Sequence, residues 1–108
     1  MPEHQPLSGR VAIVTGSGRR IGREIAEALA RAGAAVVVNA RSNAAEADAV
    51  VAAIEKAGGR SASCLADVAQ PDQAERLIAT AVERFGRLDI LVNNAAVRAR
   101  REVGDISN

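Results

Sequence analysis

Short apolar runs alternate with stretches of helical periodicity along this chain. The runs at residues 10–15, 35–39, 61–66 and 88–92 are typical of buried strands in a parallel sheet. Between them, apolar residues recur three and four positions apart in residues 21–32, 47–54 and 74–85, which predicts three amphipathic helices. Boundary signals agree with this division, because glycines end the first and third helical stretches, Pro71 opens the third, and Asn43 precedes the second with Glu46 at capping-box spacing.

The β-α-β-α-β-α-β order predicts an α/β fold with a Rossmann-like, doubly wound parallel sheet. Right-handed crossovers give a partial sheet of about four strands and three helices, with strand order 3-2-1-4. We expect residues 1–108 to form a single, truncated domain in which residues 1–6 are a disordered leader. The fourth strand is as apolar as a strand covered on both faces, yet this order places it at an edge.

A glycine-rich segment, Thr15-Gly-Ser-Gly-Arg-Arg-Ile-Gly22, joins the first strand to the first helix. Glycines allow a tight turn and a close backbone approach, and a helix N-terminus presents N–H groups to a pyrophosphate. The glycine spacing is one residue longer than the common dinucleotide fingerprint, and an ordinary strand-to-helix turn is the alternative. A mononucleotide P-loop is excluded because no Gly-Lys-Ser/Thr follows the turn.

The end of the second strand predicts which dinucleotide is bound. An acid about 20 residues beyond the turn binds the ribose of NAD, but this stretch reads Asn39-Ala-Arg-Ser42 and has no acid. Arg41 can form a charge-assisted fork to a 2′-phosphate, and Arg19 can reach the same group. Each arginine alone is equally typical of a solvated side chain, but together they favour NADP(H) over NAD(H). The missing acid also disfavours an S-adenosylmethionine-dependent methyltransferase.

Polar residues also follow the third and fourth strands. Asp67 can accept a hydrogen bond from an adenine amino group while Val68 packs nearby, or it can stabilise the next helix through the helix dipole. Asn93 and Asn94 end the fourth strand beside the first, where they can either contact a cofactor or tie neighbouring backbones together. Both pairs of alternatives stay open at this point.

Composition excludes several other classes of protein. The content of 48% hydrophobic and 25% charged residues is typical of a globular domain, and a net charge of +1 indicates no polybasic face for nucleic acid or membrane. The single aromatic residue, Phe85, gives no platform for stacking bases. Cys64 is the lone cysteine, expected as a buried inert thiol, and with no signal peptide it favours the cytoplasm. We assign no metal site.

Together, residues 7–16, the glycine-rich turn, Asp67-Val68 and residues 91–96 resemble the short-chain dehydrogenase/reductase family over residues 7–97. The resemblance implies a Rossmann fold, an NAD(P)(H) cofactor and hydride transfer to carbonyls or alcohols. The family's Thr-Gly-x-x-x-Gly-x-Gly pattern has Arg20 in place of its middle glycine, and Ala96 replaces the last glycine of Asn-Asn-Ala-Gly. Members resembling pteridine reductases carry such an arginine, while 3-oxoacyl-carrier-protein reductases and sugar dehydrogenases fit equally well.

The resemblance assigns cofactor contacts residue by residue. Asp67 and Val68 match the family's adenine-contacting pair, and Arg19 and Arg41 occupy positions that are often basic in NADP-preferring members. The candidate cofactor-binding residues are Gly16, Ser17, Gly18, Arg19, Arg20, Ile21, Gly22, Arg41, Ser42, Asp67, Val68, Asn93, Asn94 and Ala95.

The family's catalytic residues find no match in this chain. They are a Ser and a Tyr-x-x-x-Lys, but the sequence has no tyrosine and its only lysine, Lys56, falls in the second helix. We therefore expect the NADP(H)-binding N-terminal portion of an oxidoreductase, which takes a small-molecule substrate only as a complete, homo-oligomeric enzyme. The alternative is a naturally short, non-catalytic nucleotide-binding or interaction module whose open fourth strand is paired in a dimer.

Overall fold

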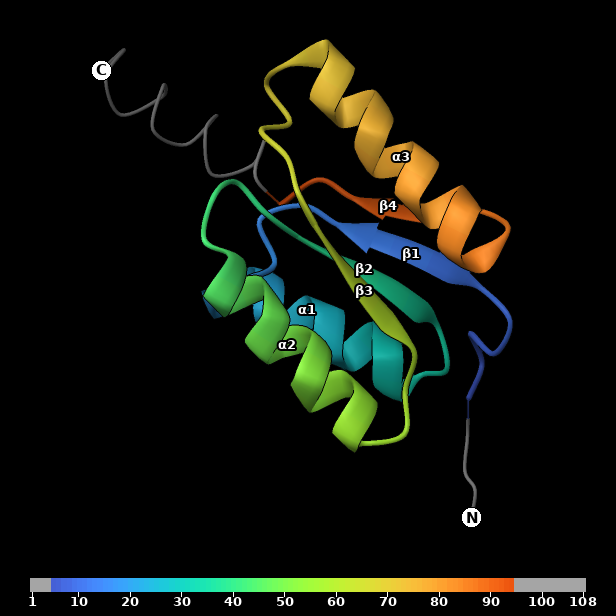
Figure 1. The fold of residues 1–108 in the computed structure, drawn as a ribbon. Coiled ribbons are helices and arrows are strands. Elements are labelled where there is room, and N and C mark those ends of the chain that lie inside the picture. The colour runs from blue at the N-terminus through green and yellow to red at the C-terminus, as the bar shows by residue number, and fades with distance from the viewer. Residues whose placement is uncertain (1–4, 95–108) are drawn as a thin grey trace, which may run out of the picture.

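Four parallel strands and three helices make up the computed structural model, which describes residues 5–94. The strands are β1 (Val11–Val14), β2 (Ala35–Ala40), β3 (Ser61–Leu65) and β4 (Ile90–Val92). The helices are α1 (Arg20–Arg31), α2 (Ala44–Lys56) and α3 (Pro71–Phe85). The sheet order is β3-β2-β1-β4, which confirms the predicted Rossmann-like architecture (Figure 1).

The helices cover the two faces of the sheet unequally, with α1 and α2 on one face and α3 on the other (Figure 1). Successive strand residues point to opposite faces, so the apolar runs of β1 and β2 contribute to both cores. The core under α1 and α2 contains Ala12, Val14, Ala26, Ala30, Ala34, Val36, Val38, Ala40, Ala47, Val50 and Ile54. The core under α3 contains Val11, Ile13, Ala35, Val37, Leu77 and Ala81.

The buried face of α1 differs from the stripe that the apolar pattern suggested. Its buried residues are Gly22, Ala26 and Ala30, whereas Ile21, at the start of the predicted stripe, is 61% exposed. Small side chains let a helix lie close to the sheet, and larger ones then fall to the sides of the contact. Within the apolar stripe of residues 21–32, Ile25 and Leu29 do pack against the core, but the stripe does not include the buried Ala26 and Ala30.

The boundary signals are confirmed where the structure describes them. The Asn43 side chain accepts a hydrogen bond from the backbone N–H of Glu46 at 3.1 Å, and Pro71 occupies the first turn of α3. Gly86 ends α3 in the left-handed conformation, with φ 87°. Residues 5 and 6, assigned to a disordered leader, belong to a turn in which the Gln5 carbonyl accepts the Ser8 N–H.

The fourth strand begins at Ile90, two residues later than predicted. Asp89, the residue before it, is joined to β1 by both its main chain and its side chain. The Asp89 N–H donates to the Val11 carbonyl, and the Val11 N–H donates back to the Asp89 carboxylate, each at 2.9 Å. Arg87 hydrogen-bonds that carboxylate at 2.7 Å, and Arg10 lies 3.5 Å from it. The hydrogen bond from Arg87 lowers the pKa of Asp89 most, followed by the Val11 N–H.

We predict that Asp89→Asn lowers stability at neutral pH but not in acid. A carboxyl group whose pKa is lower in the folded chain stabilises the fold above its unfolded pKa, and the stabilisation is lost as pH falls through the folded pKa. The difference in free energy of unfolding between wild type and Asp89→Asn should therefore close as the pH falls below about 3.8, the ordinary pKa of an Asp. Urea denaturation at several pH values measures this difference.

Arg87→Gln is the matched control, because it removes the principal partner of Asp89. It should reproduce part of the loss at neutral pH and add little to Asp89→Asn in the double variant. A difference between wild type and Asp89→Asn that stays constant down to the acid limit would contradict this account.

Candidate dinucleotide site

The turn between β1 and α1 folds back so tightly that helix and turn are in direct contact. Gly16 adopts a left-handed conformation with φ 61°. A Cβ atom at Gly22 would lie 2.2 Å from the Gly16 carbonyl oxygen, so no side chain fits there. The same carbonyl accepts a hydrogen bond from Asn94 Nδ2 at 3.2 Å, which ties the turn to the end of β4. Sequence reasoning left the role of Asn94 open, and the structure gives it this backbone tie.

The buried side chain of Asn39, at the end of β2, fixes the other flank of the turn. Its Oδ1 accepts the Gly16 N–H at 3.0 Å, and its Nδ2 donates to the carbonyls of Cys64 and Ala66, both at 3.1 Å. One amide thus connects the turn, β2 and the end of β3. The only signal in the sequence was a polar residue within an apolar run, and sequence reasoning did not assign it a role.

Ser17 belongs to the same buried network. Its hydroxyl donates to the Val14 carbonyl at 2.6 Å and accepts the Asn39 N–H at 2.9 Å, while its own N–H donates to the Asn39 carbonyl at 2.7 Å. Ser17 is fully buried, so its place in the site is to shape the turn from within. A direct contact between Ser17 and a cofactor stays a prediction.

Arg20 starts α1 in an unusual backbone conformation. Its φ is 59°, in the left-handed region that a side chain with a Cβ adopts at a cost of about 1–2 kcal/mol. This is the position at which the family pattern has glycine. The residue is exposed and lies at the positive end of the helix dipole, where a cation is unfavourable. Two local effects therefore oppose an arginine here.

The two arginines predicted to recognise a phosphate each lie beside an acid. The guanidinium of Arg19 lies 3.9 Å from the Glu46 carboxylate in α2, and that of Arg41 lies 3.9 Å from the Asp67 carboxylate. A Cβ built at Gly18 would lie 3.5 Å from the Ala40 side chain, which shows that the turn reaches the end of β2. Arg19 and Arg41 therefore flank one region at the carboxyl ends of the strands.

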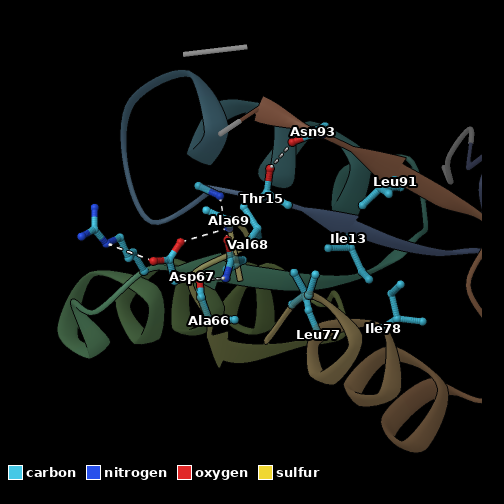
Figure 2. A pocket seen from close by; sticks show the side chains of 14 residues that line it. Ile13, Thr15, Ala66, Asp67, Val68, Ala69, Leu77, Ile78, Leu91 and Asn93 are labelled. Carbon is cyan, nitrogen blue, oxygen red and sulfur yellow. Dashed lines mark hydrogen bonds and ion pairs between the residues drawn. The ribbon is translucent and has the colours of Figure 1, made fainter. Parts of the chain in front are cut away.

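A pocket of about 540 Å³ opens on the α3 side of this edge. Its polar lining includes Thr15, Asn39, Arg41, Asp67 and Asn93, and its apolar part runs along β1, β4 and α3 (Figure 2). The hydroxyl of Thr15 lies 3.4 Å from Asn93 Oδ1, which links the ends of β1 and β4.

The structure brings most of the predicted site residues to this one end of the sheet, because the carboxyl ends of parallel strands share an edge. Ser42 and Ile21 are exposed there, and Val68 lines the pocket. Ala95 lies outside the described residues. Within residues 5–94, no three His, Cys, Asp or Glu side chains are grouped as metal ligands would be, and no helix is long and apolar enough to cross a membrane.

The chemistry of these residues fits an adenine dinucleotide. The turn presents the first N–H groups of a helix, two exposed arginines suit phosphate, and the adjoining pocket combines an acid acceptor with apolar walls. Fold and site together define an α/β domain of the dinucleotide-binding class.

Comparison with known proteins identifies the family. The family model for short chain dehydrogenases matches residues 10–108. An uncharacterized oxidoreductase of Methylorubrum extorquens is 57% identical over 91 residues, covering 84% of this chain and 37% of that protein. The trihydroxynaphthalene reductase of Colletotrichum orbiculare is 45% identical over 101 residues, covering 94% of this chain and 36% of that protein.

A crystal structure of a hydroxysteroid dehydrogenase from Escherichia coli aligns with a TM-score of 0.79 and 42% identity, covering 82% of this chain and 37% of the other. The chain belongs to the short-chain dehydrogenase family, whose members bind an NAD(P)(H) dinucleotide. It spans little more than a third of the length of these relatives.

We predict that Arg20→Gly raises the free energy of unfolding by about 0.5–1 kcal/mol, because glycine relieves the left-handed backbone strain while adding freedom to the unfolded chain. Urea denaturation followed by circular dichroism measures the change. Arg23→Gly, three residues further along the same helix, is the control and should lower stability by about 1 kcal/mol. Equal losses in the two variants would show that the conformation of Arg20 carries no strain.

Proposed function

We propose that this chain is the NADP(H)-binding N-terminal portion of a short-chain oxidoreductase that acts on carbonyl or alcohol groups. The observation that carries the proposal is Arg41. It stands directly after β2, where an NAD-binding domain would carry an acid for the ribose hydroxyls, and its side chain is 82% exposed beside the pocket. A charge-assisted bond from a guanidinium to a 2′-phosphate contributes roughly 1.5–3 kcal/mol.

The remaining candidate residues divide between the other parts of the cofactor. Arg20 and the N–H groups at the start of α1 are assigned to the pyrophosphate, which would offset both the strain and the unfavourable dipole at Arg20. Asp67 and Val68 are assigned to the adenine, and Arg19 to the 2′-phosphate together with Arg41. When bound, the dinucleotide supplies the hydride chemistry.

The assignment to carbonyl and alcohol chemistry draws on the names of the relatives. A trihydroxynaphthalene reductase and a hydroxysteroid dehydrogenase both act, by name, on oxygenated ring compounds. The names differ in substrate but share a hydroxylated ring compound, which supports the type of group that reacts. A cytoplasmic location and a homo-oligomeric complete enzyme belong to the same proposal.

We predict that Arg41→Asp lowers the preference for NADP⁺ over NAD⁺ by at least about tenfold. The variant loses the guanidinium–phosphate bond and places a carboxylate where it repels the phosphate but accepts a ribose hydroxyl. Calorimetric titration of both dinucleotides against the full-length protein carrying this sequence measures the ratio. Arg84→Asp, in the last turn of α3, changes the net charge equally away from the site and should leave the ratio as it is. Unchanged relative affinities in Arg41→Asp would refute the role of Arg41.

We also predict that the 108-residue chain alone shows no reductase activity. It contains no tyrosine, and Lys56 lies in α2, at the far end from the turn, so no residue present matches the acid/base group of the family. Incubation with NADPH and a panel of ketones, followed by NADPH absorbance, tests this expectation, with a full-length relative as positive control. Robust turnover by the purified chain would overturn it.

A further inference from the structure

The carboxylate of Asp67 is held in a defined orientation at the mouth of the pocket. Its Oδ1 accepts the Ala69 N–H at 3.0 Å, and its own backbone N–H donates to Gln73 Oε1 at 2.6 Å. Oδ2 is the oxygen that faces Arg41, at 3.9 Å from Nε (Figure 2). The Asp67 side chain is 32% exposed, with one oxygen bound to the loop and the other directed to the arginine.

Arg41 approaches Asp67 from a different strand end. It follows β2, whereas Asp67 follows β3, and both line the same pocket. The guanidinium assigned above to a phosphate thus already has an anion beside it. Arg19 has a similar neighbour in Glu46, but Glu46 does not line this pocket, so the geometry favours the pair formed by Arg41 and Asp67.

We propose that Asp67 is a positioning residue that competes with the 2′-phosphate for Arg41 and thereby sets how much that phosphate contributes to binding. This inference rests on the proposed function. When the phosphate enters, Arg41 exchanges one anion for another. A nucleotide without the 2′-phosphate leaves Arg41 with Asp67.

The expected size of the effect follows from exposure. Exposed ion pairs contribute little, and a 3.9 Å pair with an arginine that is 82% exposed belongs to that class. Removing the competitor should therefore strengthen the contribution of the phosphate by about two- to fivefold. A carboxylate near the phosphate also repels it directly, and a double-mutant cycle with Arg41 separates this repulsion from competition.

The test compares adenosine 2′,5′-bisphosphate with adenosine 5′-diphosphate by calorimetry. The ratio of the affinity for the 2′,5′-bisphosphate to the affinity for the 5′-diphosphate isolates the effect of phosphate position, because contacts to the base cancel. Asp67→Asn preserves the acceptor for the Ala69 N–H, and it should raise the ratio about two- to fivefold. Asp67→Glu restores the charge and should bring the ratio back toward wild type. In an Arg41→Ala background, Asp67→Asn should change the ratio much less.

The outcomes separate this inference from the proposed function. If Arg41→Ala leaves the ratio unchanged, the NADP assignment fails and the competition fails with it. If Arg41→Ala lowers the ratio but Asp67→Asn leaves it unchanged or lowers it, the competition alone is overturned. Equal increases with and without Arg41 would assign the effect to direct repulsion and would also overturn it. Glu27→Gln, which breaks the 2.9 Å pair of Arg23 and Glu27 on α1, is the control and should not move the ratio.

Discussion

The candidate site depends on the buried amide of Asn39. This side chain joins the turn after β1 to the ends of β2 and β3 through one accepted and three donated hydrogen bonds. Each of these partners is a buried or partly buried backbone group, and an unpaired buried group costs about 1–3 kcal/mol. The Asn39 side chain thus fixes the shape of the turn and the direction of the first N–H groups of α1. It can do so without touching a ligand.

Much of the fold could be predicted from the sequence, because each element carries its own local signal. The apolar runs, the Asn43 cap and Gly86 specify strands and helix ends without reference to the rest of the chain. The buried face of α1 could not be found in this way. Two of its residues, Ala26 and Ala30, are weakly apolar, and their burial follows from how closely the helix approaches the sheet.

In the candidate site, too, some features could be predicted from the sequence and others could not. Arg41 and Asp67 could be placed at the edge of the sheet from topology alone, since each follows a parallel strand. The proximity of Arg41 to Asp67 depends on side-chain directions that only the paired strands determine. The same is true of the hydrogen bonds of the Asn39 amide. The left-handed conformation of Arg20 is of this kind too, because a strained backbone angle is imposed by its surroundings against local preference. Arg20 adopts a backbone angle that arginine disfavours, and it does so in the glycine-rich turn. Such conflicts between a residue and its conformation are expected to occur at functional sites.

The pairing of β1 with β4 has a consequence for how the site assembles. Strands β1, β2 and β3 meet through crossovers of moderate length, but the bond between Val11 and Asp89 joins residues 78 positions apart. Closing a longer loop carries a larger entropic cost, and non-local contacts of this kind are slow to form. The contacts of Asn93 and Asn94 with the first turn span the same 78 positions. The candidate-site end of the sheet therefore depends on contacts that bring together the two ends of the described chain.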